Sequence, residues 1–293
     1  MRLKDYTGQE INDLLDSGEL SILEAMGAGD LKKEMVWIGR LCSFYIKLIC
    51  RIRDDQRLRK RASAIIKSAA PASMNGLLPQ SEDTIVVGFN HPSLGEVCRL
   101  LHIGFDSYPD REFLFPVNLP WYESMVGVIP ELHRLGINIT PMITPATEQK
   151  LTQRFEGDQG KMDEIEFLRM VFDRRYIKEI KSIASKKGVI FIAPSATRQK
   201  EIIGDYVHPS MTVVAHLVLK GGKRAMFVPV AVVSPILGNR ELNLFRRYRF
   251  IPCETFSSEE VSELTAGRDR AFDFTFLRRI EKVYLENTSA IER

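Results

Sequence analysis

Three short runs of apolar, largely β-branched residues constrain the fold of this chain more than any other feature of its sequence. They are Thr84–Phe89, Val189–Ala193 and Ala225–Val233. Runs of this kind, bounded by turn-forming residues, are typical of strands that are buried in a sheet. Stretches with apolar residues at helical spacing lie between them. We therefore predict an α/β fold, with a mixed, largely buried sheet flanked by helices.

Weaker signals extend the predicted sheet. Phe113–Val117, Ile137–Thr140 and Tyr248–Cys253 each have the composition of a short strand. Pro141 is expected to end the second of these strands. Pro229 lies inside the third apolar run, and a proline in such a position indicates a bulge or an edge strand.

The stretches between these strands predict helices. Residues 119–136 are typical of a helix or an irregular loop, and residues 144–161 of a polar, mobile segment. A long helix follows to residue 186, and further helices are predicted at 209–220 and 268–286. One face of the long helix is charged, which is typical of a solvated surface. Its basic residues are Arg169, Arg174, Arg175, Lys178 and Lys181.

The N-terminal part differs in composition from the rest. Residues 1–78 are predicted to form a helical region that precedes an α/β domain at residues 79–293, with a linker around residues 68–82. Residues 34–53 are apolar and aromatic around most of a helix, and a basic cluster overlaps their end. This composition fits either an interfacial membrane helix or a core helix followed by a solvated basic helix. The basic cluster comprises Arg51, Arg53, Arg57, Arg59, Lys60, Arg61 and Lys67.

Composition narrows the class of protein. The net charge of +3 is nearly balanced, and no nucleic-acid-binding module surrounds the basic cluster, so we expect no nucleic-acid partner. The four cysteines form no CxxC pair and no zinc-like cluster with histidine. We therefore expect reduced thiols, no bound metal and a cytoplasmic location. The sequence shows no signal-peptide pattern and no apolar run long enough for a transmembrane helix.

A histidine and a glutamate stand where the first apolar run ends. The run stops at Asn90-His91-Pro92, and Pro92 suits the first position of a helix while it keeps His91 out of the α region. Apolar residues recur at helical spacing from Val97 onward. His91 is thus predicted in the turn between the carboxyl end of a strand and the amino end of a helix. Open α/β sheets bind their ligands at such turns.

Glu96 follows His91 by five residues. On one continuous helix their side chains would point about 140° apart, but with His91 outside the helix the carboxylate can reach back to the imidazole. A carboxylate on one ring nitrogen fixes the tautomer and leaves the other nitrogen free to act as a base. The pair is therefore a candidate general base for a hydroxyl group, without a serine or cysteine nucleophile.

A turn of small residues with one fixed cation ends the second apolar run: Pro194, Ser195, Ala196, Thr197 and Arg198. Small residues let backbone N–H groups approach an anion, and the arginine fork suits phosphate. These five residues are candidate substrate-binding residues, together with Asn90 and Ser93 beside the histidine.

Four sequence blocks occur in a fixed order: NHPSLGE, LGINI, APSATR and FVPVA. In this order they resemble the glycerolipid acyltransferase superfamily, which includes glycerol-3-phosphate and lysophosphatidate acyltransferases. That family has a histidine followed five residues later by an acid, usually aspartate, and His91 with Glu96 is similar to this pair. The third block looks like that of the plant-plastid glycerol-3-phosphate acyltransferases, which also carry an N-terminal helical domain. The resemblance covers roughly residues 80–255.

The resemblance implies an O-acyltransferase. It would move a fatty acyl group from acyl-CoA or acyl-carrier protein to a hydroxyl of glycerol 3-phosphate, lysophosphatidate or a similar acceptor, with no cofactor besides the thioester co-substrate. His91 would be the general base, Glu96 would orient it, and Arg198 would bind the acceptor phosphate. The basic faces could dock an acidic carrier protein or an anionic bilayer, with the protein cytoplasmic or peripheral at a membrane.

Two alternatives stay open at this point. The third block has Ser195-Ala196 where the family usually has Glu-Gly, and the second block lacks the arginine that the family carries near the position of Pro141. These departures favour a catalytically silent member that binds lipid or a partner. A hydrolase of another α/β type is the further alternative, although no G-x-S-x-G motif is present.

Overall fold

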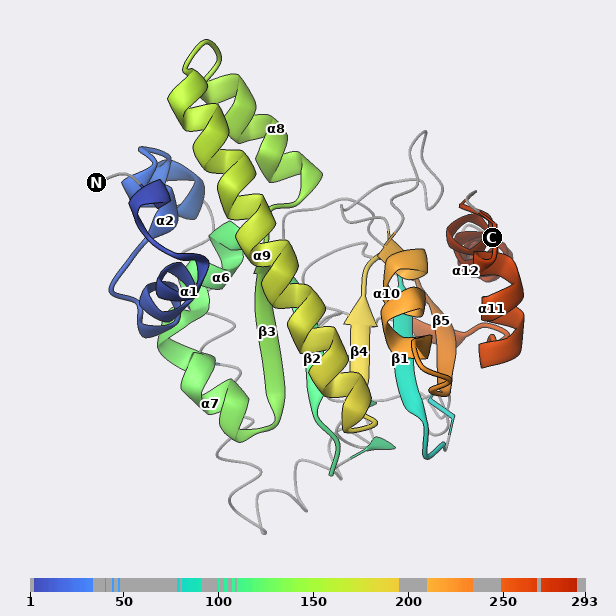
Figure 1. Cartoon of the computed structure of the whole chain (residues 1–293). Coiled ribbons are helices and arrows are strands. Elements are labelled where there is room, and N and C mark those ends of the chain that lie inside the picture. Colours follow the sequence, from blue (N-terminus) through green and yellow to red (C-terminus); the bar gives the residue numbers. More distant parts are fainter. Residues whose placement is uncertain are drawn as a thin grey trace. The chain divides into compact units, whose positions relative to one another are not determined.

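A six-stranded sheet flanked by helices forms the framework of the protein (Figure 1). Its strands lie in the order β3-β2-β4-β1-β5-β6. The predicted fold class is confirmed, because the sheet is mixed and a helical region lies at the N-terminus. This computed structural model describes residues 3–33, 40, 44, 47, 78–79, 81–90, 100, 103–104, 107–108, 110–194, 210–233, 249–267 and 270–288.

The chain divides into two compact units, each built from two stretches of sequence. The first unit combines residues 1–65 with 115–179, and the second combines residues 66–114 with 180–293. The domain boundary predicted between residues 78 and 79 stays a prediction.

Strand β1 (Thr84–Phe89) is the centre of the second unit and is the first of the predicted apolar runs. It lies between β4 (Val189–Ile192) and β5 (Ala225–Val233), and both run parallel to it. Strand β2 (Phe113–Asn118) begins parallel to β4, whereas β6 (Arg249–Pro252) is antiparallel to β5. Every residue of β1 and β4 is buried, as expected for parallel strands covered on both faces.

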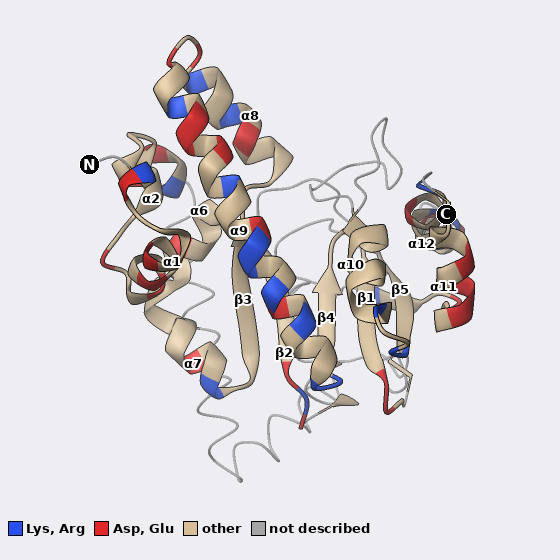
Figure 2. Ribbon diagram, in the orientation of Figure 1, with Lys and Arg blue, Asp and Glu red and all other residues tan. Residues whose placement is uncertain are grey.

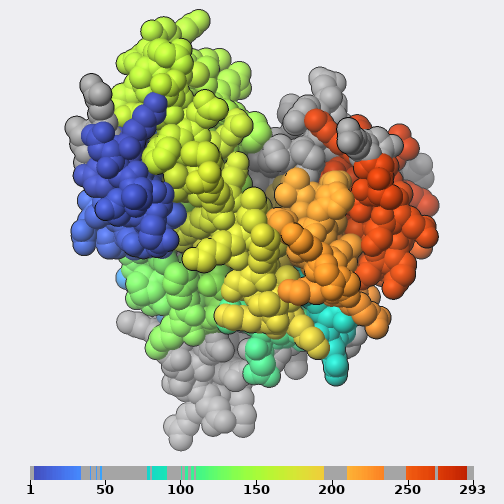
Figure 3. All heavy atoms as spheres, in the orientation of Figure 1, coloured from blue at the N-terminus to red at the C-terminus, as the bar shows by residue number. Residues whose placement is uncertain are grey.

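Three helices of the second unit contact one another, and α12 also lies against β5. They are α10 (Ser210–Leu219), α11 (Ser258–Thr265) and α12 (Ala271–Thr288). Figure 1 shows α10 in front of β1, and Figure 3 shows the orange side chains of α10 next to the red ones of the C-terminal helices. Helices α10 and α12 match predicted helices, whereas α11 has no counterpart among the predictions.

An aromatic cluster joins α12 to the sheet. The rings of Phe227, Phe256, Phe272 and Phe276 lie with neighbouring centroids 5.4 to 5.8 Å apart. Gly88 of β1 lies directly beneath this cluster, because a Cβ atom there would be 2.3 Å from a ring carbon of Phe276. The absence of a side chain at residue 88 therefore allows α12 to approach β1.

Pro229 lies in an interior strand, but its lack of an N–H group removes no hydrogen bond between β5 and β1. Cys253 donates its N–H to the carbonyl oxygen of Pro229 at 2.9 Å, so Pro229 faces the β6 side. On that side the four residues Cys253–Phe256 lie against the three residues Phe227–Pro229, which is an irregularity of bulge type. Of the two predicted explanations the structure supports the bulge, and β5 is not an edge strand.

The first unit is mostly helical in its described residues. Helix α1 begins with a capping box between Thr7 and Glu10 and ends at Gly18, whose φ of 77° suits glycine. Short helices follow the carboxyl end of β2 and lead into β3 (Ile137–Met142). The described helices of this unit are η1 (Leu3–Asp5), α1 (Gly8–Ser17), α2 (Ile22–Ala25), α6 (Leu119–Met125), η3 (Val126–Val128), α7 (Ile129–Arg134), α8 (Pro145–Arg154) and most of α9 (Gln159–Ser185).

Two predictions of secondary structure are wrong in this unit. Pro141 does not end its strand, since β3 continues to Met142; β3 is an edge strand, where a missing N–H is tolerated. Residues 145–154 are not a mobile segment but the helix α8, and the next helix begins at residue 159. Pro145 occupies the first helical turn of α8 and good helix formers follow it, so local propensity outweighs the polar composition.

Most of the basic residues predicted on a solvated face of α9 are exposed, as Figure 2 shows for the charged residues along this helix. Arg175 is the exception. Its side chain is only 10% exposed and forms ion pairs with Asp16 and Glu179. The prediction of a solvated Arg175 is therefore wrong, because helical spacing places a residue on a face but cannot show what covers it.

A buried carboxylate holds α2 in place. Glu123 of α6 is 6% exposed and accepts hydrogen bonds from the Ser21 hydroxyl at 2.7 Å and the Leu23 N–H at 3.1 Å. Burial raises the pKa of Glu123, while these hydrogen bonds oppose the rise. A carboxyl group with a raised pKa in the folded state holds its proton more tightly than in the unfolded chain. Its contribution to stability therefore falls as the pH rises through the folded-state pKa.

Replacing Glu123 by glutamine is expected to keep both contacts and remove this pH dependence. The amide oxygen accepts from the Leu23 N–H, and the amide nitrogen donates to the Ser21 hydroxyl. The unfolding free energy of Glu123→Gln, relative to the original protein, should therefore rise between pH 4 and pH 8 in urea titrations. Glu123→Ala is the matched control, because it leaves Ser21 and Leu23 without their acceptor and should cost about 1–3 kcal/mol. A relative stability of Glu123→Gln that falls with pH would contradict the raised pKa.

Candidate functional site

The two sequence motifs follow neighbouring parallel strands at the same edge of the sheet. Gly88 of β1 lies opposite Ile192 of β4 in the parallel register. Asn90 and Pro194 are each two residues further along, so both lie at the carboxyl edge of the sheet. This is the edge at which α/β sheets bind ligands.

The structure describes only two of the predicted site residues, Asn90 and Pro194. His91 follows Asn90 directly in sequence, and Ser195 follows Pro194. The remaining predicted site residues lie outside the described part of the chain, and their roles stay predictions. They are His91, Ser93, Glu96, Ser195, Ala196, Thr197 and Arg198.

Asn90 binds the backbone of β5. Its side-chain nitrogen donates to the carbonyl oxygen of Val232 at 2.9 Å, and its side-chain oxygen accepts from the N–H of Val232 at 2.6 Å. The residue is 7% exposed. Its amide group is thus engaged by the protein itself, which the prediction of a substrate-binding Asn90 did not include.

Pro194 lies next to the beginning of α10. The hydroxyl of Ser210, the first residue of α10, donates to the carbonyl oxygen of Pro194 at 3.4 Å. Pro194 and Ser210, the described residues on either side of the segment that contains Arg198, therefore lie next to each other.

A carboxylate from α12 holds the same helix end. Asp273 is fully buried, and its Oδ1 accepts from the backbone N–H groups of Met211 at 2.9 Å and Thr212 at 3.2 Å. Its Oδ2 accepts from the hydroxyl of Thr212. A carboxylate at a helix N-terminus satisfies N–H groups that have no partner within the helix, and it suits the helix dipole. Sequence reasoning missed Asp273. The feature that could have indicated it is an acidic residue placed among phenylalanines in Phe272–Phe276.

Asp273→Ala is expected to lower the unfolding free energy by about 2–3 kcal/mol. The substitution leaves two buried N–H groups without an acceptor and removes a helix cap. Asp273→Asn retains one acceptor oxygen and should lose less. Urea denaturation with a constant m value measures both changes, and equal stability of Asp273→Ala and the original protein would contradict the clamp.

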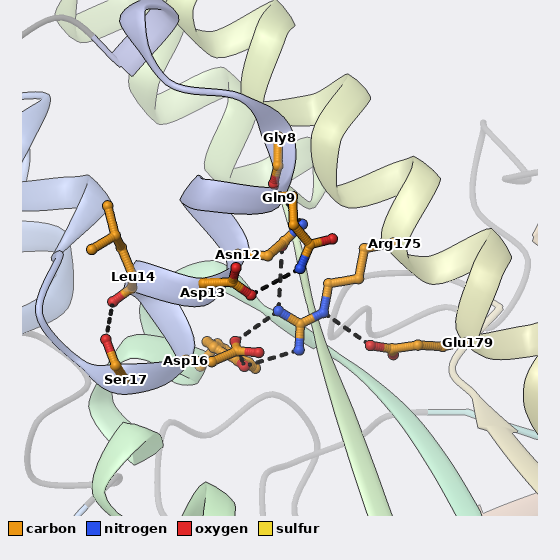
Figure 4. A network of polar contacts seen from close by, with 10 residues as sticks. Gly8, Gln9, Asn12, Asp13, Leu14, Asp16, Ser17, Arg175 and Glu179 are labelled. Atoms are coloured by element: carbon orange, nitrogen blue, oxygen red, sulfur yellow. Dashed lines mark hydrogen bonds and ion pairs between the residues drawn. The ribbon is translucent and has the colours of Figure 1, made fainter.

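A second cluster of ionisable groups lies in the first unit, centred on Arg175 (Figure 4). Its guanidinium donates to Glu179 at 2.9 Å, to Asp16 at 2.7 Å and to Asn12 at 3.3 Å. It also donates to the hydroxyl of Tyr122 at 3.2 Å, and that hydroxyl donates to Asp16 at 2.5 Å. Because these contacts join α1, α6 and α9 and engage most of the arginine donors, we interpret the cluster as structural.

The ionisable groups of this cluster are perturbed by burial. Burial raises the pKa of the Tyr122 phenol, although the neighbouring Arg175 opposes the rise. Burial also raises the pKa of Glu179, again opposed by Arg175. Because Arg175 pairs with both carboxylates, the cluster stabilises helix packing. The second carboxylate oxygen of Glu179 is buried without a hydrogen-bond partner among the described residues.

The described residues give little support for a metal site or for a cysteine nucleophile. They contain no group of three or more histidine, cysteine, aspartate or glutamate side chains that could hold a metal ion. Cys253 is a free, buried thiol, and burial raises its pKa to about 11, so it is not a thiolate nucleophile at neutral pH. No described helix is both long and apolar enough to span a membrane.

An open groove of about 550 Å³ lies in the first unit along α9, between residues such as Phe167, Met170 and Ile177. Charged residues also line the groove, and two of them form the exposed ion pair Lys4–Asp163. None of the predicted site residues lines it.

Comparison with known proteins assigns the chain to no family. No protein-family model matches the sequence, and no curated protein matches it either. The resemblance to glycerolipid acyltransferases therefore depends on the sequence blocks and on the sheet edge at which their flanking residues lie.

Proposed function

We propose that the protein is an O-acyltransferase of the glycerolipid type. The observation that carries the proposal is the parallel register of β1 and β4, which brings the residues preceding the His91 and Arg198 motifs to one sheet edge. A base and a phosphate ligand must share a cleft if they are to act on one phosphorylated alcohol. Because β1 and β4 are adjacent and end at the same edge of the sheet, the segments that follow them can line one cleft.

In the proposed reaction His91 removes the proton from an acceptor hydroxyl while that oxygen attacks the carbonyl carbon of an acyl thioester. Glu96 orients the imidazole and stabilises its cationic form. Backbone N–H groups near the motif turns would stabilise the oxyanion of the tetrahedral intermediate. The intermediate collapses with cleavage of the C–S bond, and the proton held by His91 passes to the departing thiolate. Arg198 binds the phosphate of the acceptor.

The donor class is acyl-CoA or acyl-carrier protein, and the acceptor class is glycerol 3-phosphate, lysophosphatidate or a similar alcohol. The protein would act in the cytoplasm or at a membrane surface.

A free-thiol assay tests the proposal. Purified protein is given acyl-CoA or acyl-carrier donors with phosphorylated or neutral glycerol-type acceptors, and thiol release is followed together with the acylated product. We expect release that depends on the acceptor and is greatest with a phosphorylated one. Thiol release without acylated product would indicate a hydrolase. No release with any pair would favour a catalytically silent, lipid- or partner-binding protein.

A further inference from the structure

The side chain of Asn90 continues the pairing of β1 beyond the point where its backbone pairing ends. The β1–β5 ladder ends at Phe89 opposite Val230. Two residues further along β5, the N–H and C=O of Val232 both bond to the amide of Asn90. Val232 is fully buried, and within the described part of the chain Asn90 is the partner of both of these backbone groups.

Asn90 is also the last described residue before the predicted base. His91 begins one peptide bond later, with consecutive Cα atoms about 3.8 Å apart, and Pro92 restricts the backbone of His91 from the other side. A side chain that is bonded twice to a buried strand fixes the position and direction from which the chain continues.

We propose that Asn90 is a positioning residue, which anchors the start of the His91 turn to β5 through the backbone of Val232 instead of binding substrate. The inference rests on the proposed function for its catalytic consequence. The anchor itself depends only on the two hydrogen bonds to Val232.

The chain offers a matched control at the opposite end of the same strand. The hydroxyl of Ser258 accepts from the N–H of Ala225 and donates to its carbonyl oxygen, both at 2.9 Å. Like Asn90, Ser258 is a side chain that engages both backbone groups of one β5 residue. Ala225 begins β5 and Val232 lies near its other end, so the two anchors are about 23 Å apart along the strand.

Kinetics of Asn90→Ala and Ser258→Ala test the inference. A displacement of about 1 Å in a catalytic group can lower the rate about 10²-fold, so kcat of Asn90→Ala should fall by about that factor. KM for the acceptor should stay within about threefold, because a positioning residue does not touch the substrate. Ser258→Ala should keep the original kcat. A raised KM with unchanged kcat in Asn90→Ala would show a substrate-binding role and overturn the proposal.

Asn90→Asp gives a second readout. Its carboxylate can accept from the N–H of Val232, but the other oxygen would face the carbonyl oxygen of Val232, so the protonated form is favoured. We expect kcat of Asn90→Asp to fall with rising pH, relative to the original protein, as this carboxyl group loses its proton. A pH profile parallel to that of the original protein would contradict the anchor.

A measurement without turnover separates this inference from the proposed function. The imidazole signal of His91 is assigned by its absence in His91→Ala, and its titration is followed by NMR in the original protein, Asn90→Ala and Ser258→Ala. We expect an altered chemical shift or midpoint in Asn90→Ala alone. Unaltered His91 titration in Asn90→Ala would overturn the inference even if acyl transfer is observed. Failure to find acyl transfer, with altered titration, would reject the function and leave the anchor supported.

Discussion

His91→Ala is expected to lower kcat for acyl transfer by about 10²–10⁴-fold, the usual contribution of a positioned general base. The fold should be preserved, because the hydrogen bonds that end β1 come from Asn90 and Val232. The measurement is thiol release under saturating donor and acceptor, together with circular dichroism and a urea titration.

The kinetics of Arg198→Ala should be compared with those of His91→Ala. If Arg198 binds the acceptor phosphate, its loss should chiefly raise KM for phosphorylated acceptors and leave neutral acceptors unaffected. The two variants would then separate proton removal from acceptor binding. Transfer at the original rate by folded His91→Ala would reject the mechanism.

Arg175→Ala is expected to lower the unfolding free energy by about 3 kcal/mol. Removing one partner of a buried ion pair leaves the other charge without compensation, which costs about 3–5 kcal/mol. The lower end applies here because the side chains of Asp16 and Glu179 remain 36% and 24% exposed. Urea denaturation measures the loss, and α1 is the element expected to detach first.

Arg174→Ala is the control for this second prediction. Arg174 precedes Arg175 on α9 and is exposed, so its truncation should change stability by less than about 0.5 kcal/mol. A combined Arg175→Met, Asp16→Asn, Glu179→Gln variant removes all three charges and should regain part of the lost stability. Equal stabilities of Arg174→Ala and Arg175→Ala would show that the cluster contributes nothing measurable.

The sheet could be predicted from sequence because its signal is local. A strand lies in each of the three apolar runs, Thr84–Phe89, Val189–Ala193 and Ala225–Val233. An uninterrupted apolar run has no polar face to expose to water, so it is predicted to be buried on both sides. The edge position of β3 could not be predicted in this way, and it explains why Pro141 is accommodated. Strand order depends on pairing between distant segments, and the sequence of one strand does not show which other strands pair with it.

The polar contacts were the least predictable part. Asp273 and Arg175 both lie in helices with charged residues nearby, and nothing in their spacing distinguishes them from solvated side chains. Asp273 binds Thr212, 61 residues away in sequence, and Arg175 binds Asp16, 159 residues away, besides Glu179 on its own helix. For the candidate site, sequence reasoning identified the two strand ends that precede the motifs. Their adjacency in the sheet and the engagement of Asn90 by Val232 required the structure.

The close approach of Phe276 to Gly88 couples the packing of α12 on the sheet to the helix end that Asp273 holds. The same helix carries Asp273, three residues before Phe276, at the end of α10. Any side chain at residue 88 would push α12 outward and draw Asp273 away from α10. In a library of random variants, destabilising substitutions should therefore be found at Gly88 and on the side of α12 that carries Phe276 and Asp273.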